Sequence, residues 1–177
     1  KCHLDQVRHL ADAWRDPCSL AGRPRLCTSD LSRDDKSNGI SMNILYIGGG
    51  FVGACSAAVS ADSGHNTLVF DVDKEKVRKL SSLDRDTIQS CLHEEGLAEL
   101  LIRNKDRIRF TTDISEVKEF SDTVDAVFLC LPTPEKEGAE GETDLRYYIS
   151  AIEMVGPIFA ARNGNSQEKR IVFVNKS

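Results

Sequence analysis

The feature that most constrains the fold is a glycine-rich segment in which Gly48, Gly50 and Gly53 follow a G-x-G-x-x-G pattern. An apolar run, Ile44–Ile47, precedes it, and a run of small residues with helical character, Phe51–Ser63, follows it. A strand that ends in glycines and leads at once into a helix is typical of the first βα unit of a parallel sheet. The sequence therefore predicts a strand–loop–helix unit at this point.

This loop has the composition of a phosphate-binding loop. The first glycine allows the tight turn, the second lets a pyrophosphate approach the backbone, and the third lets the helix pack on the strand. Free amides and the positive end of the helix dipole then hold the phosphates. The predicted contacts are Gly48, Gly50, Phe51, Val52 and Gly53. The alternative is a glycine-rich turn without a ligand, which the strand and helix on either side disfavour.

A second apolar run, Thr67–Phe70, ends at Asp71, which lies 18 residues after Gly53. A carboxylate at this place accepts hydrogen bonds from ribose hydroxyls and repels a 2′-phosphate, so it favours NAD over NADP. Lys76 is placed to reach the ribose or a phosphate, although an exposed, solvated lysine is the alternative. We expect Asp73 to cap the next helix.

Apolar runs and helical periods alternate through the rest of the chain, which predicts an α/β fold. We expect a Rossmann-type, doubly wound parallel sheet with strand order 3-2-1-4-5 and helices on both faces. The predicted strands are Ile44–Ile47, Thr67–Phe70, Ile108–Phe110, Val124–Leu131 and Ile171–Val174. The predicted helices are Phe51–Ser63, Lys74–Leu80, Ile88–Asn104, Ile114–Phe120 and a stretch from Asp144 that Pro157 should kink or restart.

The fourth predicted strand, which its composition suggests is buried on both faces, ends in Leu131-Pro132-Thr133-Pro134. In this fold, ligands lie at the carboxyl ends of the strands, between the first and the fourth. We therefore predict that Leu131, Pro132 and Thr133 face the cofactor. An ordinary turn that ends the strand is the alternative.

Composition excludes several other classes of protein. The net charge of −5 argues against nucleic acid or an anionic membrane as a partner. No apolar run is long enough to span a membrane, and the six cysteines show neither disulfide nor metal-site spacing. We expect a cytoplasmic protein without a bound metal. Residues 1–41 are expected to be a leader, a non-native or disordered extension, or alternatively a docking arm; residues 42–177 are expected to form the working domain.

From Met42 to Ser177 the sequence resembles the amino-terminal, NAD-binding domain of the UDP-glucose/GDP-mannose dehydrogenase family. The glycine loop with its preceding strand is the most specific match. The other matching segments are Gly64-His65, Asp71 to Val77, Glu94 to Leu97, Thr111 to Asp113, Pro132 to Pro134 and Asp144 to Tyr147.

The resemblance implies an NAD-dependent, two-step oxidation of the C6 alcohol of a nucleotide sugar, through a cysteine thioester. UDP-glucose, oxidised to UDP-glucuronate with two NAD, is the first choice of substrate; GDP-mannose and UDP-N-acetylmannosamine stay open. By this resemblance Ser177 contacts the cofactor and the catalytic residues lie beyond it. The chain is then expected to bind NAD without turnover, and its parent to be a homo-oligomer. A non-catalytic NAD-sensing domain and a hydroxyacid-type dehydrogenase are the alternatives.

Overall fold

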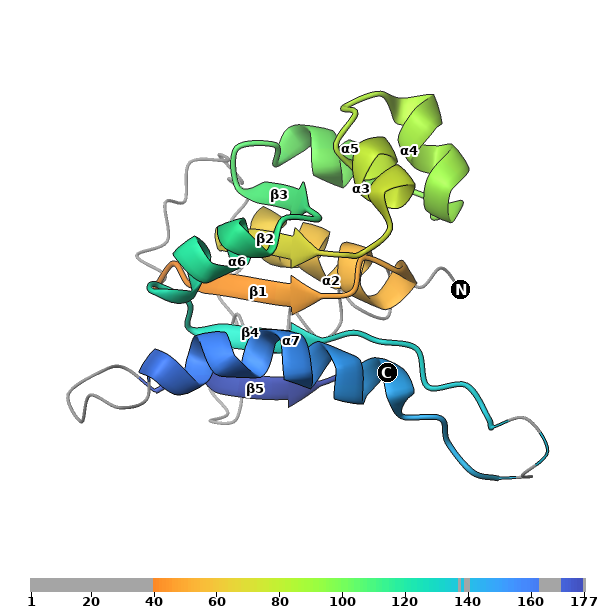
Figure 1. Ribbon diagram of the computed structural model, residues 1–177. Coiled ribbons are helices and arrows are strands. Elements are labelled where there is room, and N and C mark those ends of the chain that lie inside the picture. The colour runs from red at the N-terminus through yellow and green to blue at the C-terminus, as the bar shows by residue number, and fades with distance from the viewer. Residues whose placement is uncertain (1–39, 137, 139–140, 163–169, 177) are drawn as a thin grey trace, which may run out of the picture.

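The described residues form a parallel sheet of five strands with helices on both faces (Figure 1). The structure is a computed structural model that describes residues 40–136, 138, 141–162 and 170–176. The strand order is β3-β2-β1-β4-β5, as the sequence predicts. The strands are β1 (Asn43–Ile47), β2 (Asn66–Phe70), β3 (Ile108–Thr111), β4 (Ala126–Leu129) and β5 (Val172–Asn175). Ser177 and nearly all of the segment 1–41 lie outside the described residues.

The helices divide between the two faces of the sheet. The helices are α2 (Phe51–Asp62), α3 (Lys74–Leu80), α4 (Arg85–Leu92), α5 (Leu97–Arg103), α6 (Ile114–Ser121) and α7 (Arg146–Arg162). Ile44 and Tyr46 of β1 point into a core shared with α2, α4 and α5, whereas Leu45 and Ile47 point into a core shared with α6 and α7. This alternation buries β1 on both sides, as a central parallel strand requires. None of the described helices is long and apolar enough to cross a bilayer.

The carboxyl ends of the three inner strands lie level with one another. Ile47 of β1 pairs with Phe70 of β2 on one side and with Leu129 of β4 on the other. The loops that follow these strands therefore begin at one edge of the sheet. That edge contains the crevice between β1 and β4, where the order of the strands reverses.

Two predicted helices differ from the structure. The single helix expected over Ile88–Asn104 is instead α4 and α5, because His93 and Gly96 adopt left-handed backbone conformations with φ of 51° and 81°. Conversely, α7 continues through Pro157. Proline removes one hydrogen bond to the carbonyl four residues earlier. That carbonyl belongs to Glu153, which lies on the exposed side of the helix, where water can replace the lost donor.

The fourth strand is shorter and less buried than its composition suggests. It extends over Ala126–Leu129 rather than Val124–Leu131. Val127 and Leu129 are buried against α6 and α7, but Ala126 and Phe128 on the other face are only half-buried. Both faces of β4 therefore pack against the core, as expected, but the face with Ala126 and Phe128 is less completely buried.

Candidate cofactor-binding site

The glycine loop closes tightly against the ends of β2 and β4. The Gly48 amide donates to the Phe70 carbonyl at 2.8 Å, so the loop is tied to the second strand. Gly48 has a φ of 102°, and a Cβ there would overlap the carbonyl oxygen of Cys130. Both the backbone conformation and the available space therefore require glycine at this position.

The other two motif glycines differ sharply in their surroundings. A Cβ on Gly53 would overlap the Gly48 carbonyl oxygen, because α2 packs directly on the loop. A Cβ on Gly50 would meet nothing within 4 Å. The surface above Gly50 is thus open, as the approach of a pyrophosphate to the backbone requires.

The amino terminus of α2 carries unused hydrogen-bond donors and no negative charge. The Ala54 amide donates to the Gly50 carbonyl at 2.9 Å, which is the first bond of the helix. By helix geometry, the amides of Phe51, Val52 and Gly53 have no acceptor within the helix. No acidic side chain lies in the first turn of α2, and no side chain caps it. The free amides and the positive end of the helix dipole together favour an anion at the start of α2.

Asp71 is buried just beyond β2, and its carboxylate is held from three sides. One oxygen, Oδ2, accepts from the Gly49 amide at 2.7 Å and from the Lys76 ammonium at 2.9 Å. The other, Oδ1, accepts from the Asp73 amide at 2.9 Å. Only 7% of the residue is exposed. A carboxylate held in this way is fixed in orientation before any ligand arrives.

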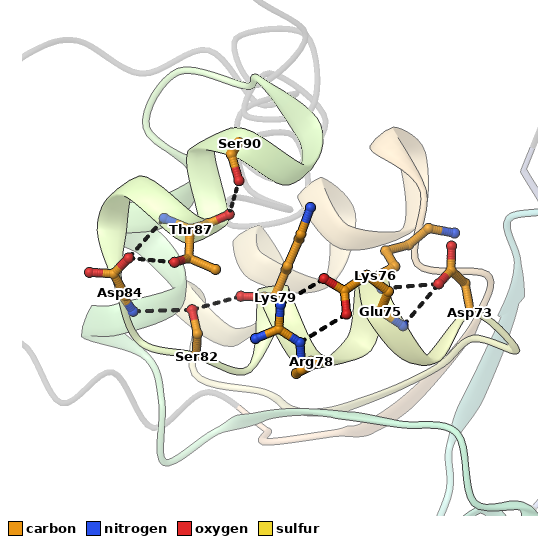
Figure 2. Close-up of polar contacts among 9 residues, drawn as sticks. All are labelled: Asp73, Glu75, Lys76, Arg78, Lys79, Ser82, Asp84, Thr87 and Ser90. Atoms are coloured by element: carbon orange, nitrogen blue, oxygen red, sulfur yellow. Dashed lines mark hydrogen bonds and ion pairs between the residues drawn. The ribbon is translucent and has the colours of Figure 1, made fainter.

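Lys76 and Asp73 belong to the start of α3. Figure 2 shows the Asp73 carboxylate facing the amides of Glu75 and Lys76, to which it is bonded at 3.0 and 3.1 Å. Asp73 is therefore the helix cap that the sequence predicts. Lys76 directs its ammonium to Asp71 rather than to solvent, which places it at the edge of the predicted ribose site.

The third predicted segment follows β4 and lies against the glycine loop. The Cys130 amide donates to the Ile47 carbonyl at 2.8 Å, and the Leu131 side chain lies beside Gly48. Pro132 and Thr133 come next and are exposed. The structure thus brings together the glycine loop, Asp71 with Lys76, and the start of the Pro-Thr-Pro segment. The predicted contact at Ser177 lies outside the described residues.

Groups with nucleophilic or metal-binding chemistry do not gather here among the described residues. Burial raises the pKa of the Cys130 thiol to about 12, against a smaller opposing effect of Lys176, so this thiol is protonated at neutral pH. His65 lies at the amino-terminal ends of the strands, away from the glycine loop. Its Nδ1 accepts a hydrogen bond from the Met42 amide at 3.3 Å. No group of three or more potential metal ligands is found in the described part of the chain.

Two residues that shape the site escaped the sequence analysis. Gly49, the variable position of the motif, supplies the amide that holds Asp71, and a Cβ there would lie 3.3 Å from the Asp71 carboxylate. The Thr111 carbonyl accepts from the Asp71 amide at 3.1 Å. Both contacts join segments distant in sequence; the only signal was the additional glycine, Gly49, in the middle of the run Gly48–Gly50.

Comparison with known proteins agrees with this geometry. The model of the UDP-glucose/GDP-mannose dehydrogenase family NAD-binding domain matches residues 42–177. The chain belongs to this family. The chain is 37% identical over 123 residues to the UDP-glucose 6-dehydrogenase AglM of Haloferax volcanii. This alignment covers 69% of the chain and 26% of AglM. It is 39% identical over 114 residues to the UDP-glucose 6-dehydrogenase of Rickettsia typhi, covering 64% and 24%.

Solved structures show the same relationship. The GDP-mannose dehydrogenase of Pseudomonas aeruginosa, in a ternary complex, aligns with a TM-score of 0.61 and 29% identity over 77% of this chain and 29% of that one. An NDP-N-acetyl-D-galactosaminuronic acid dehydrogenase from Methanosarcina mazei aligns with a TM-score of 0.58 and 26% identity, covering 78% and 28%. The chain spans about a quarter of the length of these relatives.

The described residues fit the cofactor of this family, NAD. The α2 amides and the open surface above Gly50 suit a pyrophosphate, and Asp71 lies where ribose hydroxyls need an acceptor. Residues 42–177 thus form an NAD-binding domain of the UDP-glucose/GDP-mannose dehydrogenase family.

Proposed function

We propose that this domain serves a nucleotide-sugar 6-dehydrogenase that oxidises UDP-glucose to UDP-glucuronate with two NAD. The observation that carries the proposal is the meeting of the Gly48–Gly53 loop, Asp71 and the Leu131–Thr133 segment at one edge of the sheet. UDP-glucose is preferred because the Haloferax and Rickettsia relatives carry that name. A cytoplasmic location, a homo-oligomeric parent and the absence of nucleic-acid or membrane partners stay predictions.

Each part of the site has a separate role in the proposal. NAD supplies the hydride acceptor when it is bound. The amides at the start of α2, among them those of Phe51 and Val52, donate hydrogen bonds to the pyrophosphate. Asp71 accepts from the adenosine ribose, and Lys76 holds that carboxylate in place. Leu131, Pro132 and Thr133 form the wall of the crevice on the β4 side, with Ser177 expected beside them.

The test is calorimetric titration of the chain with NAD and with NADP. We expect NAD to bind more tightly, because the Asp71 carboxylate repels a 2′-phosphate. Asp71→Asn should weaken NAD binding by about 10- to 100-fold, as expected for a lost charged hydrogen bond. It should also raise the affinity for NADP relative to NAD, a ratio that does not depend on the fraction of folded protein. Asp73→Asn is the matched control, because asparagine caps a helix equally well.

Equal affinity of the unaltered chain for NAD and NADP would show that Asp71 does not set the cofactor preference. NADH fluorescence tests the second part of the proposal. We expect no NADH from UDP-glucose and NAD, because the chain spans only about a quarter of the length of its UDP-glucose 6-dehydrogenase relatives. The Haloferax enzyme is the positive control, and NADH production by the 177-residue chain would contradict the expectation.

A further inference from the structure

The carboxylate of Asp71 has few acceptor positions left for a ligand. An ionised carboxylate offers about four positions to hydrogen-bond donors. Three of them are occupied by groups of the chain itself: the Gly49 amide and the Lys76 ammonium bond to Oδ2, and the Asp73 amide bonds to Oδ1. At most one position therefore stays open, and it lies on Oδ1.

An adenosine ribose brings two hydroxyl groups, 2′ and 3′, to a carboxylate at this place. One of them can donate to the open position on Oδ1. The other has to replace the Lys76 ammonium on Oδ2, or accept a hydrogen bond from it, because an ammonium is a donor only. The Gly49 amide belongs to the loop backbone and cannot leave Oδ2 without moving the loop. Binding of the ribose therefore engages Lys76 in either case.

The start of α3 holds Lys76 next to Asp71. Asp73 caps the helix and accepts from the Lys76 amide at 3.1 Å, which fixes the first turn. A helical side chain extends back toward the amino terminus of its helix, and here that direction leads to the end of β2. The side chain of Lys76 is 27% exposed and that of Asp71 is 8% exposed. Salt screens a pair at this depth less than a surface pair, so Lys76 neutralises much of the Asp71 charge.

This neutralisation weakens the discrimination that Asp71 exerts between the two dinucleotides. A carboxylate repels the 2′-phosphate of NADP. An ammonium attracts a phosphate and donates hydrogen bonds to its oxygens. Because the two charged groups are only 2.9 Å apart, a 2′-phosphate at the ribose position would meet both of them. Asp71 alone would reject NADP more strongly than Asp71 and Lys76 together.

We propose that Lys76 is a specificity-determining residue that lowers the preference of this site for NAD over NADP. The inference rests on the proposed contact between Asp71 and the adenosine ribose. It assigns opposite effects to two neighbouring charges, since Asp71 excludes the 2′-phosphate and Lys76 reduces that exclusion. The ratio of the two affinities is then a property of the pair.

Lys79 offers a matched control on the same helix (Figure 2). It lies in the same neighbourhood as Lys76: burial raises the pKa of the Cys91 thiol, and the charges of Lys79 and Lys76 both act to lower it. The ammonium that bonds to Asp71, however, is that of Lys76. Lys79→Met therefore removes an equal charge from α3 and leaves the pair with Asp71 intact.

Calorimetric titration with NAD and with NADP tests the proposal at about 0.15 M salt, which screens exposed charges more than ~8 Å apart. Lys76→Met keeps the length and helix propensity of the side chain and removes its charge. We expect the NAD-to-NADP affinity ratio to rise about 10-fold, the order of one charged hydrogen bond. Lys76→Arg restores the charge and should return the ratio toward that of the unaltered chain. Lys76→Gln is a second neutral variant in case Lys76→Met does not fold.

A ratio that rises in the neutral Lys76 variants, and in neither Lys76→Arg nor Lys79→Met, supports the proposal. An unchanged or lower ratio in Lys76→Met overturns it, because a purely structural change weakens the binding of both dinucleotides equally. An equal rise in Lys76→Arg or Lys79→Met also overturns it, since the ammonium beside Asp71 is then not the cause.

Two outcomes for the unaltered chain complete the test. NAD binding without any NADP binding at millimolar concentration overturns the inference alone, because Lys76 then does not admit the 2′-phosphate. Binding of neither dinucleotide shows that the cofactor site itself is wrong, and the inference fails with it. Failure of the inference and failure of the proposed function are therefore distinguishable.

Discussion

Strands β2 and β5 have similar apolar sequences but very different environments. In β2, the run Thr67–Phe70 is buried throughout, whereas Val172 and Phe173 of β5 are half-exposed or more. The difference comes from the neighbours: β2 lies between two strands and under helices on both faces, whereas β5 has one neighbouring strand among the described residues. An apolar run therefore predicts a strand, but the number of its neighbours decides how much stability its side chains contribute.

The same contrast separates the cofactor site from β5. The site is built on the covered strands β1 and β2, where backbone atoms approach so closely that a single Cβ does not fit. Close packing of this kind holds the loop and Asp71 in place. At β5, Val172 and Phe173 are half-exposed or more, so substitutions there should affect folding less.

The largest effect is expected at the closest contact of the covered region. Gly53→Ala should destabilise the domain by about 3 kcal/mol, because its Cβ would push α2 away from the Gly48 carbonyl. The better helix propensity of alanine offsets at most ~1 kcal/mol of this. Gly50→Ala is the control and should cost less than about 1 kcal/mol, since its Cβ enters open space. Urea unfolding measures both, and equal losses would show that α2 can shift away from the loop without cost.

A second pair of variants tests the comparison of the two strands directly. Val69→Ala in β2 removes a fully buried side chain and should cost about 2–3 kcal/mol. Val172→Ala in β5 should cost less than about 0.5 kcal/mol, because this side chain is 58% exposed. Thermal or urea unfolding of the two variants gives the difference. A large loss for Val172→Ala would mean that β5 is already covered in the isolated chain.

The sequence predicts the sheet well because strand order depends on alternation and on the handedness of crossovers, which are local rules. It predicts Asp71 and the three motif glycines for the same reason. It does not predict the break at His93, since a non-glycine residue in a left-handed conformation has no sequence signal. Nor does it predict that Gly49 and Lys76 hold the Asp71 carboxylate, because that depends on how β1, β2 and α3 meet.

The smallest expected effect concerns His65, which directly precedes β2. Burial, and then the positive charge of Arg107, lower the pKa of His65, while Asp125 acts in the opposite direction. The unfolded chain therefore binds a proton more readily than the folded one. The stability that the neutral imidazole contributes is complete above its ordinary pKa of about 6.5 and is lost as the pH falls below it.

His65→Asn tests this with the hydrogen bond retained, because the asparagine Oδ1 replaces Nδ1 as the acceptor for the Met42 amide. Urea unfolding of both proteins at neutral pH and at about pH 5, below the ordinary histidine pKa, measures the loss on acidification. We expect the unaltered chain to lose more stability than His65→Asn over this interval. The control is His93→Asn, at the other histidine in the described region, because asparagine also tolerates the left-handed backbone that His93 adopts after α4. Equal losses of stability for His65→Asn and the unaltered chain would show that burial at the start of β2 does not penalise the charged imidazole. Water would then reach the start of β2 more readily than the packing around His65 indicates.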